Sequence, residues 1–244
     1  MAIPHISEWE KRVGITSWTR FETSENTIDT TIFKPLAACK PHVRVVYYGR
    51  VAESPRECLL VVGWKSREAY MAFKKSPHYE ELMTNLGAQS TPLVQPQTQV
   101  AVFSRVWFNM SFGPNTEVLA AYFPSSTTPE TQQAVLNTER LVHTEAMGLP
   151  SPRCYKKPPT FGWIDGLQDR NGQTAIACMW CHGWYSKELE ERFKVNERRF
   201  HLELTGTDRP LAVDVFEQDL RALGVIDWET CHVSFTRILE LGSV

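Results

Sequence analysis

The sequence predicts an α+β protein built from two consecutive β-α-β-β-α-β units. The first reason is a short motif, Gly-Trp followed by a Ser and a Glu, which occurs twice about 120 residues apart in a chain of 244. The second reason is its setting, because each copy ends an apolar, strand-like run and begins a helix-like one. The third is an ordinary globular composition, with 42% hydrophobic and 22% charged residues, which excludes a disordered or collagen-like chain.

The two copies of the motif match position by position. They are Gly63-Trp64-Lys65-Ser66-Arg67-Glu68 with Phe73-Lys74, and Gly183-Trp184-Tyr185-Ser186-Lys187-Glu188 with Phe193-Lys194. In each copy the serine is a favourable helix N-cap, and the glutamate lies in the first turn, where the helix dipole favours negative charge. We therefore expect a first unit at 9–112 and a second unit at 113–244.

The elements of the first unit follow from apolar runs and from the prolines that end them. In chain order we expect a strand at 13–20, a helix at 29–39 that ends before Pro41, strands at 43–52 and 58–64, a helix at 66–86 that Pro77 interrupts, and a strand at 98–103. Residues 104–112 should remain strand-like, and residues 113–115 should form the turn into the second unit.

The second unit is expected to repeat this order with one additional helix. We expect a strand at 117–123, a helix at 129–147, strands at 161–164 and 174–184, a helix at 186–204, an inserted helix at about 210–223, and a strand at 230–239. Each unit would then be ferredoxin-like, with one sheet face left open. Packing the two open faces together would form an intrachain α+β barrel.

One stretch carries a resemblance to known proteins. The run from Val61 to Tyr70, continuing to Phe73 and to Ser76-Pro77-His78-Tyr79, is similar to the antibiotic-biosynthesis monooxygenase and stress-responsive barrel groups. The chain thus resembles the dimeric α+β barrel superfamily in a tandem fused form, as found in fungal natural-product pathways. The resemblance implies the fold and a small hydrophobic metabolite as substrate. It leaves the chemistry open, because the superfamily includes monooxygenases, polyketide cyclases, isomerases, haem-dependent enzymes and binding proteins.

The resemblance also implies positions for one acid–base pair. A plant polyketide cyclase of the superfamily uses a Tyr and a His on and after the second helix. Those positions hold Phe73 and Tyr79 in the first unit, and Phe193 and Arg199 in the second, so this pair is not retained. His78 lies one residue away, which is about 100° around a helix.

Six cysteines in a chain without a secretory signal predict free, mostly buried thiols. The run Cys178-Met179-Trp180-Cys181-His182 matches the pattern of c-type haem attachment. It is, however, apolar and strand-like, and residues three apart on a strand point to opposite faces. We therefore expect no metal and no cofactor.

The charge balance and the apolar runs limit the partners. With 26 basic and 28 acidic residues the net charge is −2, so the chain has no basic field that would attract nucleic acid. Its apolar runs are too short to cross a bilayer. We expect a cytoplasmic protein, monomeric or weakly dimeric, whose partner is a small hydrophobic or aromatic metabolite.

Histidines are the main titratable candidates near neutral pH. We take the first and third strands of each unit to run parallel side by side, with the fourth antiparallel beside the first. This arrangement would gather Tyr122, His182 and His232 at one edge of the second sheet, near the mouth of a pocket beneath the helices. We predict these three as catalytic groups that donate hydrogen bonds or transfer protons. The alternative is that both histidines are satisfied strand residues.

Further residues are predicted to bind the substrate because they are aromatic or polar and lie near these edges or in the apolar run after residue 100. They are Trp184, Trp180, Phe123, Trp64, Trp18, Tyr79, His78, Arg105 and Asn109. Trp64 and Trp184 also suit a core or a pocket wall, and Arg105 and Asn109 also suit pairing between the units. The basic run 192–199 contains glutamates and is interpreted as a solvated helix face.

The sequence favours a cofactor-independent enzyme of secondary metabolism. It would hold an aromatic or polyketide-type intermediate in an apolar pocket and promote an aldol-type or pericyclic cyclisation, because orientation alone lowers such barriers. The alternatives are a cofactor-free, quinone-forming monooxygenase, and a non-catalytic carrier or haem-binding barrel. Phosphate-loop, H-E-x-x-H and Gly-x-Ser-x-Gly motifs are absent from the sequence.

Overall fold

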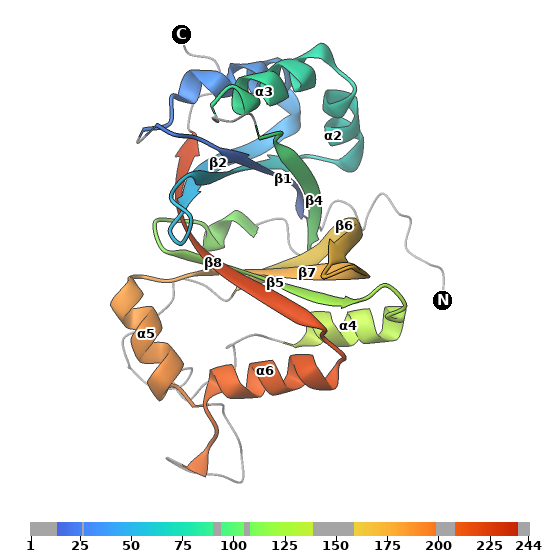
Figure 1. The fold of residues 1–244 in the computed structure, drawn as a ribbon, viewed down its shortest axis with the longest axis vertical. Coiled ribbons are helices and arrows are strands. Elements are labelled where there is room, and N and C mark those ends of the chain that lie inside the picture. Colours follow the sequence, from blue (N-terminus) through green and yellow to red (C-terminus); the bar gives the residue numbers. More distant parts are fainter. Residues whose placement is uncertain are drawn as a thin grey trace. The chain divides into compact units, whose positions relative to one another are not determined.

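A computed structural model shows how the chain folds (Figure 1). It describes residues 14–25, 27–89, 94–104, 108–138, 159–198 and 208–238. The chain divides into two compact units. The first comprises Met1–Asn109 and Cys231–Val244, and the second comprises Met110–Thr230. The last strand therefore begins in the second unit and ends in the first.

The sheet of the first unit has the strand order β4-β1-β3-β2-β8, and its neighbouring strands are antiparallel. The strands are β1 (Gly14–Glu22), β2 (Val43–Val51), β3 (Glu57–Trp64), β4 (Gln97–Phe103) and the later part of β8 (Asp227–Ile238). Each lies within three residues of its expected bounds. Alternation of apolar residues therefore predicted these strands well, because one face of each must be buried.

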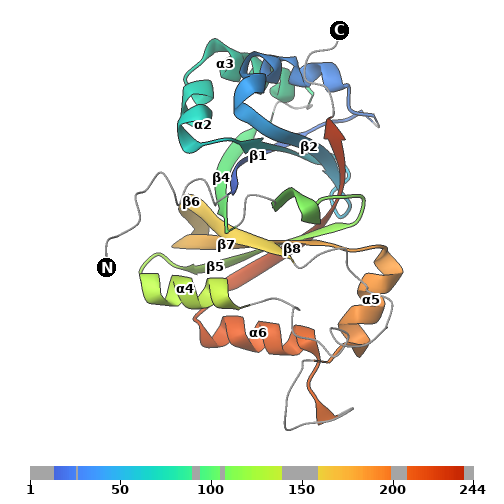
Figure 2. The ribbon, with the colours of Figure 1, turned by 180° about the vertical axis from the view of Figure 1, so that it is seen from behind.

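Helices cover one face of this sheet, as both views of the ribbon show (Figures 1 and 2). They are η1 (Thr30–His42), α2 (Arg67–Lys74) and α3 (Pro77–Gly87). The helix expected at 29–39 is a 3₁₀ helix that contains Pro35 and Pro41, and a proline removes a hydrogen bond that an α-helix needs. The interruption expected at Pro77 is confirmed, because α3 begins there.

The core of the first unit lies between this sheet and these helices. Side chains at alternate positions of the strands, such as Leu60, Val62 and Trp64 on β3, pack against Phe33 of η1 and Leu86 of α3. Trp64 also donates its indole N–H to the Ser17 hydroxyl at 2.9 Å. A buried donor is thereby satisfied inside an apolar layer.

The second unit has the strand order β6-β7-β5, with the start of β8 beside β5. Its strands are β5 (Thr116–Pro124), β6 (Thr160–Arg170) and β7 (Gln173–Gly183), and its helices are α4 (Pro129–Asn137), α5 (Lys187–Asn196) and α6 (Ala212–Ala222). Leu119 and Phe123 of β5 and Trp180 of β7 pack against Phe216 and Leu220 of α6. The inserted helix expected at about 210–223 therefore covers the sheet.

The repeated motif has the same local structure in both units. Ser66 and Ser186 are extended N-caps with φ/ψ of −156°/169° and −155°/167°. Each hydroxyl accepts from the backbone N–H three residues later, Ala69 at 3.2 Å and Leu189 at 3.3 Å. The N-caps expected from the sequence are confirmed. The tandem origin of the units and the intrachain barrel remain predictions.

Several expectations about the fold are wrong. The first and third strands of each unit are antiparallel, β1 with β3 and β5 with β7. Part of the run expected to stay strand-like, Phe108–Ser111, is a 3₁₀ helix, η2. Helix α5 ends at Asn196 rather than at 204, and β6 is longer than the short strand expected. The helix expected at 129–147 is α4, which ends at Asn137, and residues 139–147 lie outside the described part of the chain.

The cysteines behave as expected where the structure describes them. The described cysteines are free, and all but Cys231 are buried. Burial raises the pKa of the Cys39 and Cys58 thiols to about 11 and also raises that of Cys178, which makes these thiols inert. No helix in the described residues has both the length and the apolar character that a membrane crossing requires.

Candidate functional site

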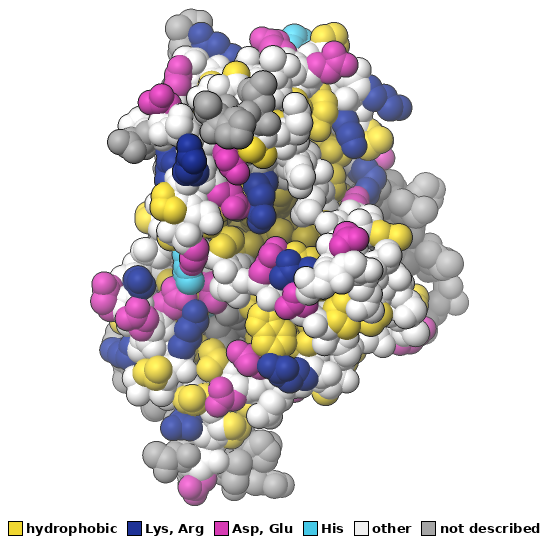
Figure 3. Space-filling model, viewed as in Figure 1, with side chains coloured by type: hydrophobic (Ala, Val, Ile, Leu, Met, Phe, Trp, Pro, Cys, Tyr) yellow, Lys and Arg dark blue, Asp and Glu magenta, His cyan; other side chains and the backbone are white. Residues whose placement is uncertain are grey.

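The second unit contains a cavity of about 280 Å³ between its sheet and its helices α5 and α6. Its lining residues come from β5, α5, α6 and the start of β8: Glu117, Leu119, Lys194, Val213, Phe216, Glu217, Leu220, Trp228 and Thr230. Most of this wall is apolar, with a few charged groups. On the second unit, Figure 3 shows apolar side chains reaching the surface among acidic and basic ones. A concave apolar site with few polar groups is the usual form of a small-molecule site.

Glu117 is the buried carboxylate of this cavity, with 2% of the residue exposed. It lies near the start of β5, at the same alternation as Leu119, so its side chain is directed to the helix-covered face. The indole N–H of Trp184 donates to its Oε2 at 3.2 Å, and Lys194 Nζ donates to its Oε1 at 3.1 Å. A carboxylate inside a protein needs such partners, because removing it from water is costly.

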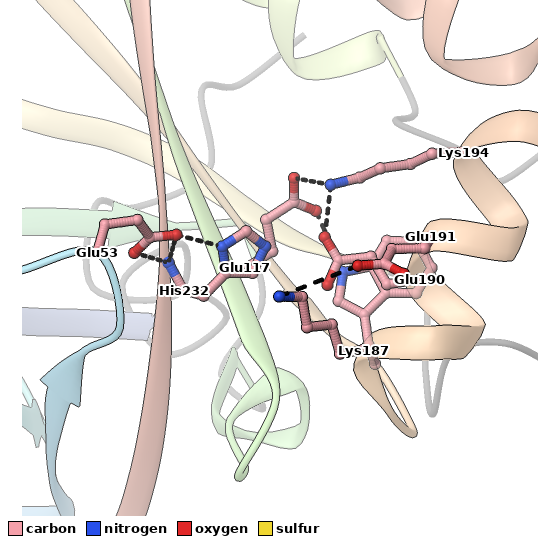
Figure 4. Close-up of polar contacts among 8 residues, drawn as sticks. Glu53, Glu117, Lys187, Glu190, Glu191, Lys194 and His232 are labelled. Atoms are coloured by element: carbon pink, nitrogen blue, oxygen red, sulfur yellow. Dashed lines mark hydrogen bonds and ion pairs between the residues drawn. The ribbon is translucent and has the colours of Figure 1, made fainter.

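Lys194 of α5 bridges two buried carboxylates (Figure 4). Besides Glu117 it contacts Glu190, one helical turn earlier, at 2.5 Å. Glu190 is almost fully buried, whereas about a third of the Lys194 side chain is exposed. An ammonium group has three N–H donors, and these two bonds occupy two of them. With two carboxylates and one ammonium, the cluster carries a formal charge of −1.

His182 and Trp184 lie beside Glu117. His182 lies directly opposite Glu117 in the register of β7 and β5, so both side chains are on the same face. The His182 ring is fully buried, and its centroid is 3.9 Å from that of Trp184. Trp184 in turn packs against Phe193 of α5. The motif residues Trp184 and Phe193 thus hold α5 against the sheet and position Lys194.

This arrangement can perform proton transfer. Glu117 is a carboxylate beside an apolar cavity, and the ammonium of Lys194 is hydrogen bonded to it. Glu117 can accept a proton from a bound ligand. The negative charge left on the ligand then lies close to the ammonium group of Lys194. A ligand carboxylate or phosphate is disfavoured by the excess of negative charge.

The expected grouping of Tyr122 with His182 is wrong in its geometry. Because β5 and β7 are antiparallel, the end of β7 lies beside the start of β5, and His182 faces Glu117. Tyr122 lies near the other end of β5, opposite Ala177, and is directed to the other face of the sheet. His232 belongs to the first unit. Catalytic roles for these three residues remain predictions.

Tyr122 takes part in a separate polar cluster of the second unit. Its hydroxyl donates to Glu229 Oε1 at 2.7 Å, and the Arg170 guanidinium lies 4.5 Å from the centre of its ring. Arg170 is also paired with Asp227 at 2.5 Å and with Glu229 at 3.1 Å. The hydrogen bond from Arg170 lowers the pKa of the Asp227 carboxyl. This cluster joins the end of β6 to the start of β8.

His232 forms a pair with Glu53 in the first unit (Figure 4). Its Nδ1 lies 2.5 Å from Glu53 Oε1, and its backbone N–H donates to Glu53 Oε2 at 2.9 Å. Burial acts to raise the pKa of Glu53, but the hydrogen bonds from His232 outweigh it, and this pKa is lowered. The pair connects the β2–β3 hairpin to β8.

The residues predicted to bind substrate are dispersed. Trp184 borders the cavity cluster, Trp180 and Phe123 lie in the core of the second unit, and Trp64 lies in that of the first. The others predicted in the first unit have separate surroundings. Trp18 is on the opposite face of the sheet from Trp64, Tyr79 packs on Phe73, His78 is exposed near Glu81, Asn109 is half-buried in η2, and Arg105 lies outside the described residues.

Sequence reasoning missed Glu117, Glu190 and Lys194. One signal was present, because Glu117 is the one acidic residue in the apolar run 116–124, at the alternation of its buried neighbours. The i, i+4 spacing of Glu190 and Lys194 was also visible, but it is equally typical of a solvated helix face. The interpretation of 192–199 as solvated is therefore wrong for Lys194, which lines the cavity.

Comparisons with known proteins show the fold. No protein-family model matches the chain, and no curated protein matches its sequence. A solved structure of a proposed monooxygenase from Lactobacillus acidophilus matches with a TM-score of 0.52 and 7% identity, over 95% of this chain and 98% of that one. An anthrone oxidase-like protein matches with a TM-score of 0.52 and 14% identity, over 94% and 95%. The likeness and the observed elements together confirm the α+β fold class predicted from the sequence.

Proposed function

We propose that the protein is an enzyme that removes a proton from a small, mostly apolar aromatic molecule bound in the cavity of the second unit. Glu117 accepts the proton, and Lys194 stabilises the negative charge that develops beside it. The observation that carries this proposal is a carboxylate only 2% exposed that lines an apolar cavity and is hydrogen bonded to a lysine. Buried titratable groups in a cleft are typical of functional sites.

The size and charge of the cavity limit the substrate. An apolar cavity of about 150 Å³ accommodates benzene, so 280 Å³ suits a molecule of one or two rings. The net negative charge of the cluster favours a neutral molecule over a carboxylate or a phosphate ester. The substrate class is therefore a neutral compound with an acidic hydroxyl or an acidic ring CH₂ group.

The reaction we propose for the resulting anion is oxidation by molecular oxygen. The names of the two structural neighbours, a proposed monooxygenase and an anthrone oxidase-like protein, support this choice over cyclisation. Glu117 removes one proton from a ring CH₂, and the carbanion transfers electrons to O₂ and forms a C–O bond. The hydroperoxide anion takes a proton back. Loss of the second C–H proton and cleavage of the O–O bond then give a carbonyl group and one water molecule.

An oxygen electrode tests this proposal with small hydroxylated aromatic compounds that contain an acidic ring CH₂. We expect the wild type to consume one O₂ per product. Glu117→Gln keeps the shape and one of the two acceptor oxygens but replaces the other by an amide NH2 group and removes the base, so we expect at least a 100-fold lower kcat. Glu191→Gln removes an exposed carboxylate from α5 and serves as the matched control with unchanged kcat.

Three outcomes contradict the proposal in different ways. Turnover that Glu117→Gln leaves intact would place the base elsewhere. A ring-closed product formed without oxygen uptake would indicate the cyclase predicted from the sequence. Binding without turnover of any compound in the series would indicate a carrier.

A further inference from the structure

The cavity has a second end, away from Lys194. The N–H of Ala212, the first residue of α6, donates to the Glu197 carbonyl directly after α5 at 3.0 Å. Helix α6 therefore begins beside the end of α5 and runs along the cavity towards the start of β8 (Figure 1). From that strand, Trp228 and Thr230 line the same cavity. The cavity thus extends from the charged groups on β5 and α5 to the later turns of α6.

Trp228 is an aromatic wall of this second end. It is partly buried and packs against the core cluster that contains Leu119, Phe216 and Leu220, which also line the cavity. The guanidinium of Arg221 lies over the Trp228 ring, 4.6 Å from its centre, and Arg221 is not among the residues that line the cavity. A cation over one face of an indole helps to hold the ring in place. The part of the ring that borders the cavity is available to an aromatic ligand.

Glu217 adds a carboxylate to this part of the wall. It lines the cavity and is exposed, and among the described residues its side chain makes no hydrogen bond or ion pair. Arg221 follows four residues later, at the spacing of a helical Glu–Arg pair, but its guanidinium is directed to Trp228. Glu117, by contrast, already accepts from an indole and an ammonium group. The Glu217 carboxylate is therefore an acceptor that a molecule bound in the cavity can reach.

The spacing along α6 relates Glu217 to the acid–base pair. Val213 packs against the cluster of Trp184 and Phe193, and Trp184 is hydrogen bonded to Glu117. Glu217 lies four residues, or about 6 Å, further along the helix. A benzene ring with two substituents in para positions has a similar span. A ligand whose reactive carbon lies at Glu117 can thus place a group on the far side of its ring near Glu217.

We infer that the substrate carries a phenolic hydroxyl on the side of its ring opposite the reacting CH₂ group, and that this hydroxyl donates to Glu217 while the ring lies against Trp228. The inference rests on the proposed function, and it narrows the substrate to a hydroxylated aromatic ring. A neutral hydroxyl suits the position better than an ammonium group, because Arg221, one helical turn away, already balances the charge of Glu217.

Two probes that differ only in this hydroxyl test the inference. 2-Tetralone is a neutral two-ring ketone with an acidic ring CH₂ group, and 6-hydroxy-2-tetralone adds a hydroxyl on the far side of the aromatic ring from that group. Glu217→Ala removes the acceptor and keeps a good helix former. By calorimetric titration we expect it to weaken binding of 6-hydroxy-2-tetralone about fivefold and to leave binding of 2-tetralone within twofold.

Asp214→Ala is the matched control. It removes another exposed carboxylate from α6, one that does not line the cavity, so we expect the affinity for both probes to stay unchanged. Trp228→Leu removes the aromatic wall and should weaken binding of both probes about three- to tenfold, because both contain the same aromatic ring.

A third probe gives a readout in the wild type, in case a variant fails to fold. The wild type should bind 6-hydroxy-2-tetralone more tightly than 2-tetralone. 6-Methoxy-2-tetralone keeps the oxygen but has no proton to donate, so it should lose this advantage.

The outcomes separate the inference from the proposed function. Equal losses for the two tetralones in Glu217→Ala, or a methoxy probe that binds the wild type as tightly as the hydroxy probe, would overturn the inference alone. Exchange of the ring CH₂ protons with deuterated solvent, followed by NMR, reports on the proposed base, because Glu117 removes a proton and a deuteron returns. Wild-type protein that does not accelerate this exchange, or acceleration that Glu117→Gln leaves intact, would overturn the proposed function even if the preference for the hydroxyl remained. Failure of all three probes to bind would overturn both.

Discussion

At the residue scale, burial distinguishes two Glu–Lys pairs on the same helix. Lys187 and Glu191 are 4.0 Å apart with 80% and 68% of their side chains exposed, whereas Lys194 and Glu190 are 2.5 Å apart with 32% and 5% exposed. Both pairs have i, i+4 spacing, and although the order Glu before Lys is the better one, either pair contributes only about 0.2–0.5 kcal/mol to the helix itself. The pairs differ in what removal of the lysine would leave behind. Without Lys194 the buried carboxylates of Glu190 and Glu117 would lose their cation, whereas without Lys187 the Glu191 carboxylate would stay in solvent.

We therefore expect Lys194→Met to lower the free energy of unfolding by about 3 kcal/mol, the lower end of the range for breaking a buried pair, since Lys194 is partly exposed. Lys187→Met should change it by less than about 0.5 kcal/mol. Urea unfolding at pH 7 measures both. Adding Glu117→Gln to Lys194→Met should recover part of the loss, and equal losses for the two single variants would contradict the assignment.

Asp227 and Arg170 give a second prediction at this scale, about pH. The hydrogen bond from Arg170 lowers the pKa of Asp227 in the folded state. The stabilisation is therefore complete above the pKa of an unfolded Asp, about 4, and is lost as pH falls through the lower folded value. We expect Arg170→Met to cost about 1 kcal/mol at pH 7, because the pair is partly exposed, and less at pH 3. Urea titrations at both pH values check this, and an equal cost at both would count against it.

At the element scale, the repeated serine caps permit a paired test. Ser66 and Ser186 have nearly identical backbone angles and make the same hydrogen bond to the third backbone N–H of α2 and α5. We expect Ser66→Ala and Ser186→Ala each to lower the free energy of unfolding by about 1 kcal/mol. Aspartate at either position keeps the acceptor and should change stability by only a few tenths. Chemical unfolding of the four variants measures this, and a cap whose loss has no effect would contradict it.

The elements themselves were largely predictable from the sequence. Strands β1 to β5 begin and end close to their expected positions, because alternation and proline breaks are local features. The type of η1 was not predicted, since the pattern that Pro35 and Pro41 interrupt is shared by α and 3₁₀ helices. The extension of β6 was missed because residues 165–170 alternate weakly and are mostly exposed or half-buried.

The candidate site was less predictable, for a physical reason. Alternation places Glu117 and His182 on a face of their strands, but it does not show which ends of β5 and β7 meet. Taking the strands as parallel brought Tyr122 to His182, whereas antiparallel pairing brings Glu117 there. The partner that makes a buried Glu117 tolerable, Lys194, lies 77 residues away on a helix, and single-sequence patterns do not report such contacts.

At the scale of the whole molecule, strand β8 links the two units. It runs unbroken from Asp227 to Ile238, and the division between the units falls within it, after Thr230. In the second unit the N–H of Ile226 donates to the Tyr122 carbonyl at 2.8 Å, and in the first unit β8 pairs with β2 from Val233 to Ile238. The two ends of this short segment are thus hydrogen bonded within different units. Weakening the hydrogen bonds in one unit should therefore also weaken those in the other.

Gly49→Ala tests this coupling. A Cβ on Gly49 would lie 2.6 Å from the Ser234 carbonyl oxygen and 2.7 Å from a Val233 side-chain carbon, and the backbone atom cannot move away without breaking the β2–β8 ladder. We expect a loss of about 1–3 kcal/mol in the free energy of unfolding, as is typical of overpacking. Hydrogen exchange should become faster along β8 in the first unit and also at 226–230 in the second. Gly172→Ala is the control for adding a methyl group where no atom lies within 4 Å, although its φ of 77° adds local strain. Faster exchange confined to 231–238 in Gly49→Ala would show that the two units open independently.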